Sequence, residues 1–247
     1  MNFDLNEDQR MLAQTVASFA KKESPVTRLR KLREDRIGYS RKVWRQMGEY
    51  GWLGVMFPEE LGGLGGSFVE AAVVLEQLGT TLVPEPVIPA LVAGAAVLKA
   101  GDPGQRKRWI EPLAGGESIL VPAFFEEQGR HDPFDVTTHA TRAGGAGGWR
   151  LSGAKRWVLA GHDADAYVVS ARTVGDPRGH DGVSLFVVDR ATRGVSARTV
   201  QTMDGRKAAL VTFDDVEVGD DRRLGDESAA ADAIDAAVDL GAAACCA

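Results

Sequence analysis

The chain has 247 residues, of which 44% are hydrophobic and 26% are charged. This is enough apolar sequence to bury the core of one large domain or two ordinary ones. Acidic residues outnumber basic ones by 35 to 29, giving a formal net charge of −6. Because a nucleic-acid-binding protein carries a basic excess, we exclude nucleic acid as a partner.

The first residues, "MNFDLNEDQR", are polar and acidic and have neither the positive start nor the apolar stretch of a signal peptide. The longest apolar run, residues 87–98, is shorter than the roughly 20 residues that a membrane span needs. Cys245 and Cys246 are adjacent, which fits a reducing compartment and provides no zinc or disulfide pattern. We therefore predict a cytoplasmic protein without membrane insertion.

Helix signals fill the first 117 residues. Asn6 with Gln9 and Ser67 with Glu70 have the spacing of capping boxes. Leu12, Val16 and Phe19 recur at helical spacing after the first box. The start signals and the glycines that end helices predict helices after Asn6 and Ser40, from residue 68 to Gly79, between Pro86 and Gly101, and between Asp102 and Gly115.

The hydrophobic period changes near residue 118. Short runs rich in Val, Thr, Leu and Phe follow, bounded by glycine and aspartate, and their spacing favours a sandwich or barrel over alternating βαβ units. The glycine-rich stretch 142–149 predicts a hairpin loop between two strands. The predicted strand segments are 118–125, 135–143, 149–159, 165–173, 182–190 and 208–218.

The fold class is therefore an α+β multidomain protein. We expect an N-terminal helical domain over residues 1–117 and a central β-barrel or sandwich domain over 118–225. The alanine-rich residues 226–247 return to a helical pattern. We expect them to be the start of a C-terminal helical domain, with the chain ending inside that helix.

Motif chemistry is sparse. The four histidines lack the close spacing of metal ligands, so no metal site is predicted, and no G-x-S-x-G, G-x-G-x-x-G or P-loop pattern is present. The loop 58–66, "PEELGGLGG", has two interpretations, a phosphate-binding loop or a tight connection between helices, and the second is favoured. Trp157 on a predicted strand either packs in the core or stacks on a flat cofactor, and the pattern alone leaves both open.

Seven segments, taken together and in order, resemble the acyl-CoA dehydrogenase family over nearly the whole chain. The closer likeness is to the small (β-type) subunits of heteromeric members, of the pimeloyl-CoA dehydrogenase kind. The segments are "FDLNEDQ", "GWLGVMFPEELGGLGG", "VLEQLG", "LAGGE", "LSGAKRWV", "HDADAYVVSART" and "VTFDDVEV".

This resemblance implies a helical domain, a β-domain and a C-terminal helical domain, with FAD bound non-covalently between the last two. It also implies an acyl-CoA substrate: a carboxylate removes the α-proton and the flavin accepts the β-hydride, giving a trans-2-enoyl-CoA. The fatty acid chemistry would be performed by a hetero-oligomer, a heterotetramer with a larger acyl-CoA dehydrogenase subunit. The carboxylate base belongs to the C-terminal domain of the family, so we nominate no catalytic residue here.

Two segments correspond to the flavin contacts of the family, and both differ from the usual residues. Phe125 and His131 stand where active members have a flavin-bonding threonine and a serine near the pyrophosphate, and Leu159 replaces another threonine. Trp157 keeps the residue that faces the ring, and Arg130 is placed to pair with the pyrophosphate. The candidate cofactor-binding residues are Phe124, Phe125, Arg130, His131, Trp157, Val158 and Leu159.

Three functions follow from these substitutions. The leading hypothesis is a flavin-dependent acyl-CoA dehydrogenase subunit. The second is a non-catalytic structural subunit that binds no FAD itself, which Phe125 and Leu159 favour and Trp157 disfavours. The third is another flavoenzyme on the same scaffold, such as an oxidase or a monooxygenase.

Overall fold

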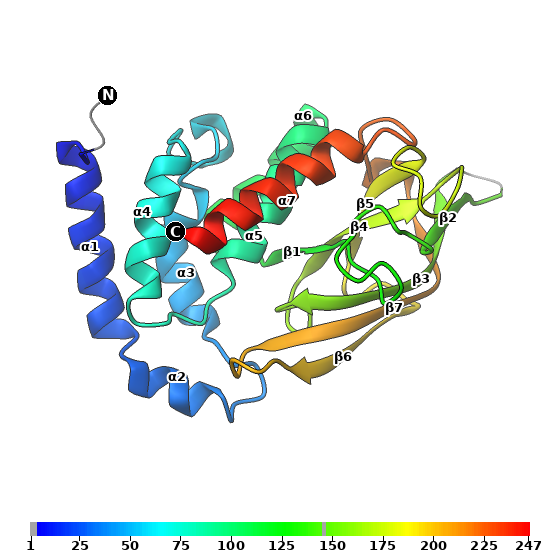
Figure 1. The fold of residues 1–247 in the computed structure, drawn as a ribbon. Helices are drawn as coiled ribbons and strands as arrows, with labels where there is room; N and C mark the ends of the chain where they lie inside the picture. The colour runs from blue at the N-terminus through cyan, green and yellow to red at the C-terminus, as the bar shows by residue number, and fades with distance from the viewer. Residues whose placement is uncertain (1–3, 145–146) are drawn as a thin grey trace.

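The helices and the sheet occupy two sides of the molecule, and the last helix runs back across the helical side (Figure 1). The computed structural model describes residues 4–144 and 147–247. In this part of the chain, no helix has the length and apolar character needed to cross a membrane. The α-helices are α1 (Glu7–Glu23), α2 (Val26–Leu32), α3 (Arg41–Glu49), α4 (Phe68–Gly79), α5 (Val87–Ala100), α6 (Pro103–Ala114) and α7 (Ala231–Cys246), and the short 3₁₀ turns are η1 (Trp52–Gly54), η2 (Glu59–Leu61) and η3 (Asp220–Arg222).

Reciprocal capping fixes where three of these helices begin. The side chain of Asn6 accepts from Gln9 N at 2.8 Å, and the side chain of Gln9 accepts from Asn6 N at 3.0 Å. The same exchange starts α4 at Ser67 and α6 at Asp102. Each box satisfies backbone N–H groups that a helix start otherwise leaves without partners.

Helix α5 is the centre of the helical side. Its residues are almost all apolar and mostly buried, as expected for a helix with neighbours on several sides. Gly94 lets the Phe57 ring approach, since a Cβ on this glycine would lie 2.3 Å from the Phe57 Cζ atom. Helix α7 packs along α5, so the last described helix covers the core that the first half of the chain builds (Figure 1).

The sheet has eight strands: seven follow the order β6-β7-β3-β2-β4-β5-β8, and β1 pairs with β4 outside this path. Strands β3 and β7 form the longest antiparallel pair, whereas β1 and β4 are parallel. Strands β4 and β5 are buried along nearly their whole length. The strands are β1 (Leu120–Ala123), β2 (His139–Arg142), β3 (Trp149–Leu159), β4 (Ala166–Arg172), β5 (Val183–Asp189), β6 (Val195–Gln201), β7 (Lys207–Val218) and β8 (Arg223–Leu224).

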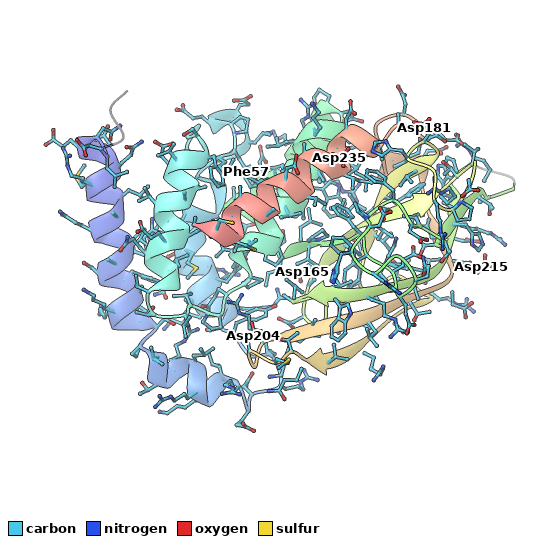
Figure 2. All side chains as sticks on the ribbon, in the orientation of Figure 1. Phe57, Asp165, Asp181, Asp204, Asp215 and Asp235 are labelled. Carbon is cyan, nitrogen blue, oxygen red and sulfur yellow. The ribbon has the colours of Figure 1, made fainter. Side chains whose placement is uncertain are left out.

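Ion pairs and hydrogen bonds join the helical side to the sheet. Arg41 at the start of α3 reaches Asp163 and Asp165, both at 2.9 Å, just before β4. Asp165 lies at the boundary between helices and strands (Figure 2) and also accepts from Ile119 N at 2.7 Å. The Trp44 indole donates to Ser118 O at 3.1 Å. These contacts connect α3 to the entry of β1 and β4.

The predicted order of helices, strands and a final helix is confirmed. Helix α2 and strand β6 were not predicted: α2 buries no residue fully, and β6 is an edge strand with a mostly exposed pattern. The predicted strand 135–143 was too long, because only residues 139–142 pair and the preceding residues instead bind side chains. The predicted hairpin loop joins β2 to β3, but residues 145–146 of that loop lie outside the described part.

A buried ion pair holds α2 against the segment before α5. The Glu85 side chain is fully buried and accepts from two nitrogens of Arg28 and from Ser40 N, the last at 3.0 Å. Removing one partner of a buried pair leaves an uncompensated charge in the interior.

Arg28→Met should therefore lower the free energy of unfolding by about 3–5 kcal/mol. Arg30→Met is the matched control, because Arg30 lies exposed on the same helix and should change stability by less than about 0.5 kcal/mol. Urea unfolding followed by circular dichroism measures both. Equal small effects would show that Glu85 is not held by Arg28.

Candidate functional site

Strand β3 carries a bulge at the residues that precede its end. Lys155 pairs with Val211 and Val158 pairs with Ala209, so Arg156 and Trp157 face a single residue of β7. Trp157 has φ +54°, in the left-handed region that bulky residues seldom adopt. Such strained positions recur at functional sites, because the surrounding structure must hold them in place.

The bulge directs two apolar side chains outward. Trp157 is 55% exposed and Leu159 is 45% exposed, whereas Val158 between them is buried. A large indole left half in solvent on a strand is unusual, because tryptophan is highly buried on average. Trp157 and Leu159 therefore form an exposed apolar face, which we call the β3 face.

The segment after β1 runs beside this face. Arg156 N donates to Phe125 O at 2.8 Å, which joins the two segments that the sequence singled out. Phe125 is half-buried and meets the ring of His131 edge-on, with centroids 6.4 Å apart. Arg130 is exposed and has φ +54°. The Phe124 and Val158 side chains lie in the core, so these two residues can offer only backbone atoms to a ligand.

A buried ion pair lies in the core beneath the β3 face and the segment after β1. Lys155 Nζ donates to Glu126 Oε1 at 2.7 Å, and both side chains are at most 1% exposed. Burial opposes the ionisation of Glu126, but Lys155, Thr137 and Gln128 outweigh it and hold the pKa of Glu126 at about 2. Burial lowers the pKa of Lys155 to about 8, although Glu126 favours its charged form. The pair is an ion pair at neutral pH.

A cavity of about 200 Å³ opens where β3 ends. Leu159 and Ala160 form one wall. The other walls come from α2, α4, the start of α5 with the segment before it, and the end of α7, and they include Leu29, Leu78, Ile88 and Ala244. Most of this lining is apolar. Arg33, Arg206 and Lys207 bring positive charge to the same cavity. Arg206 can be located in Figure 2 from the labelled Asp204, two residues before it in the same turn.

Two polar side chains of the cavity wall are already oriented. Glu85 is bound to Arg28 and Ser40, as described above. His162 Nε2 lies 2.7 Å from Ile37 O, so this nitrogen carries the proton and donates it. Burial lowers the pKa of His162, which keeps the ring neutral, and Nδ1 has no partner among the described residues.

These residues can hold a flat cofactor only in part. The Trp157 indole offers an exposed aromatic face, and Arg130 offers an exposed cation for a phosphate group. The Phe125 and Leu159 side chains have no donor for a ring nitrogen or oxygen. Within residues 4–144 and 147–247, no cluster of three or more His, Cys, Asp or Glu has the arrangement of a metal site.

Two models of one protein family match most of this chain. Residues 6–117 match the family described as acyl-CoA dehydrogenase, N-terminal domain, and residues 123–216 match acyl-CoA dehydrogenase, middle domain. The chain belongs to the acyl-CoA dehydrogenase family. One similar solved structure, with a TM-score of 0.78 and 26% identity over 97% of this chain and 62% of its own, is described as an FAD-dependent dehydrogenase, so FAD is the flat cofactor to compare with the β3 face.

Similar proteins match nearly all of this chain, but this chain matches only part of their length. Acyl-CoA dehydrogenase FadE29 of Mycobacterium tuberculosis is 29% identical over 92% of this chain and 59% of its own length. The mitochondrial short-chain specific acyl-CoA dehydrogenase of Rattus norvegicus is 31% identical over 90% and 54%. The solved structure of the Tcur3481-Tcur3483 steroid ACAD G363A variant has a TM-score of 0.82 at 29% identity, over 96% and 61%. The chain thus spans between half and two thirds of these relatives.

Sequence reasoning missed the residues that form the cavity and the buried pair. No local pattern pairs Glu126 with Lys155, because 29 positions separate them along the chain. The cavity unites α2, the segment before α5 and the β6–β7 turn, which no local pattern connects. The roles of the seven predicted cofactor-binding residues remain predictions.

Acid titration should reveal the buried pair. Folding lowers the pKa of Glu126 from 4.5 to about 2, so its stabilising contribution is complete above about pH 4.5 and is lost as the pH falls towards 2. The double variant Glu126→Leu, Lys155→Met lacks this contribution. Urea unfolding between pH 2 and 5 should show a shallower loss of stability in the double variant than in the wild type. Parallel curves would contradict the ionised pair.

Proposed function

We propose that the chain is a subunit of a flavin-dependent acyl-CoA dehydrogenase, and that FAD binds against the β3 face. The observation that supports this most directly is the half-exposed Trp157, held outward by a bulge at the edge of an apolar cavity. An apolar pocket with a few oriented polar groups is the usual form of a small-molecule site. The family membership supplies the class of reaction.

The cavity is proposed to receive the acyl group. Its wall at Leu159 is two residues from Trp157, so a ligand in the cavity would lie next to a ring stacked on the indole. The apolar side chains on α4 and near α5 would exclude water from the acyl group. The chain would thus bind and orient both reactants, which is the main task of a protein around a redox cofactor.

The flavin would supply the redox chemistry, accepting a hydride as the α-proton leaves the acyl group. Glu85 is the one carboxylate among the described cavity-lining residues, and its oxygens are bound to Arg28 and Ser40. Both oxygens of Glu85 are therefore already occupied by these hydrogen bonds. We therefore assign no α-proton base to the described residues and propose that it lies elsewhere in the assembly.

A hetero-oligomer is the proposed state of the protein. The steroid ACAD named Tcur3481-Tcur3483 carries two protein names, and this chain is 29% identical to the matched chain of its G363A variant. A larger acyl-CoA dehydrogenase subunit would complete the site. The unpaired Cys245 and Cys246 fit the reducing cytoplasm that we propose as its location.

The second candidate function is a structural subunit that binds no FAD. The half-buried Phe125 and the exposed Leu159 favour it, because neither can replace the hydrogen bonds of the family threonines. Two lost hydrogen bonds would weaken FAD binding by roughly 1–3 kcal/mol, or about one to two decades in affinity. The two candidates differ in whether this weakened affinity remains measurable.

FAD retention tests the proposal. We expect the protein, produced together with its larger subunit, to retain FAD and to reduce a dye when an acyl-CoA is added. Trp157→Ala should reduce retention about tenfold through the lost stacking, while Val174→Ala, at another exposed apolar position, should not. Colourless, inactive wild-type complex would favour the structural subunit, and oxygen uptake without dye reduction would favour another flavoenzyme.

Restoring the two hydroxyl groups is the complementary experiment. Phe125→Thr with Leu159→Thr should raise FAD affinity by about one to two decades, because each threonine supplies a side-chain hydrogen bond. Fluorescence titration with FAD measures the change. Val174→Thr, at another exposed apolar position, is the control. No gain in the double variant would count against a flavin site at these positions.

A further inference from the structure

The buried pair Glu126–Lys155 has every polar atom in use. The three hydrogen-bond donors of Lys155 Nζ reach Glu126 Oε1 at 2.7 Å, Ser170 Oγ at 2.9 Å and Phe124 O at 3.2 Å. The carboxylate of Glu126 also accepts from Thr137 and Thr138 N. The ammonium group is therefore bound by Ser170 of β4 and by the segment that contains Phe124 and Glu126.

Stability alone gives a weak reason for such a pair. Transfer of two charges from water to an interior is costly, and well-packed apolar replacements of similar size are often equally or more stable. A buried pair of this kind instead fixes one arrangement of the chain, because its hydrogen bonds are directional and an unsatisfied partner is costly. The question is which arrangement it fixes.

The pair joins the two segments that carry the predicted cofactor contacts. Lys155 is two residues before Trp157, on the strand side of the bulge. Its bond to Phe124 O fixes the backbone just before Phe125, and Arg156 N binds Phe125 O from the same strand. Glu126 continues this segment and connects it to residues 137–138. The β3 face and the 124–126 segment therefore cannot shift relative to each other while the pair is intact.

We propose that Glu126 and Lys155 are positioning residues, which hold Trp157 and the 124–126 backbone in the one arrangement that FAD requires. The proposal rests on the proposed function for its ligand. It assigns the pair to orientation of the site, not to contact with the cofactor, since both side chains are buried beneath the β3 face. An apolar pair should keep the fold and loosen this arrangement.

The informative variant is the double replacement Glu126→Leu, Lys155→Met, because a single replacement would leave one buried charge unpaired and would unfold the region. The matched control is Arg150→Met, Glu217→Leu. Arg150 and Glu217 are directly opposite on β3 and β7, form an ion pair at 2.7 Å and are largely exposed. Both doubles remove the charges of an ion pair from β3, and the control also removes the exposed contact of Arg150 with Asp215 at 3.3 Å.

Two readouts separate positioning from stability. In the full protein with its larger subunit, the buried double should bind FAD at least tenfold more weakly, with a urea midpoint close to that of the wild type. Without FAD, the fluorescence contribution of Trp157, taken as the difference from Trp157→Phe, should be more accessible to acrylamide in the buried double. The control should change neither quantity.

Each outcome has one meaning. A buried double that binds FAD as the wild type does, with Trp157 equally quenched, overturns the positioning role. Parallel losses of FAD affinity and urea midpoint also overturn it, because the pair would then act through stability. A wild type that binds no FAD refutes the proposed function, while the acrylamide measurement still tests whether the pair orients Trp157.

Discussion

A buried ammonium group on β3 dictates how this end of the sheet is built. Lys155 points into a core of apolar side chains, so its charge must be compensated within reach of Nζ. Glu126 supplies the charge, and Ser170 and Phe124 O satisfy the remaining donors. The segment that follows β1 consequently cannot leave β3. The residues 124–126, which belong to no strand, are thereby fixed against β3 beneath the β3 face.

Charge pairing also organises the boundary between helices and strands. Arg41 reaches two aspartates before β4, and Glu85 binds Arg28 and Ser40 from beside α5. The carboxyl groups and the cations come from segments far apart in sequence, so each pair forms only when the two sides are docked. The cavity lies between these two sets of contacts and the end of α7. Its walls therefore belong to elements that are held together by charge as well as by apolar packing.

Elements that depend on interactions between residues close in sequence were predicted, whereas features that depend on contacts between distant residues were not. The boxes at Asn6 and Ser67 and the glycines after helices act within four residues, so the sequence alone located these helices. Strand β6 was not predicted because this edge strand has no buried face that would give a regular apolar pattern. Helix α2 was not predicted because it has no buried apolar stripe and is joined to the rest of the fold through the Arg28–Glu85 ion pair. Trp157 was singled out from the sequence, but its exposure was not predicted. That exposure depends on a bulge in β3 that is defined only by the pairing of β3 with β7.

Phe125 and Leu159 are under different physical constraints from those on the buried pair Glu126–Lys155. Leu159 is exposed and Phe125 half-buried, so a threonine or an apolar side chain is tolerated there at little cost to the fold. Glu126 and Lys155 are buried and mutually dependent, and neither can change alone without leaving a charge in the core. A change at Phe125 or Leu159 therefore leaves the fold intact, whereas a change in one member of the pair alone does not. The proposed FAD contacts can therefore vary at Phe125 and Leu159 while the buried pair keeps its arrangement.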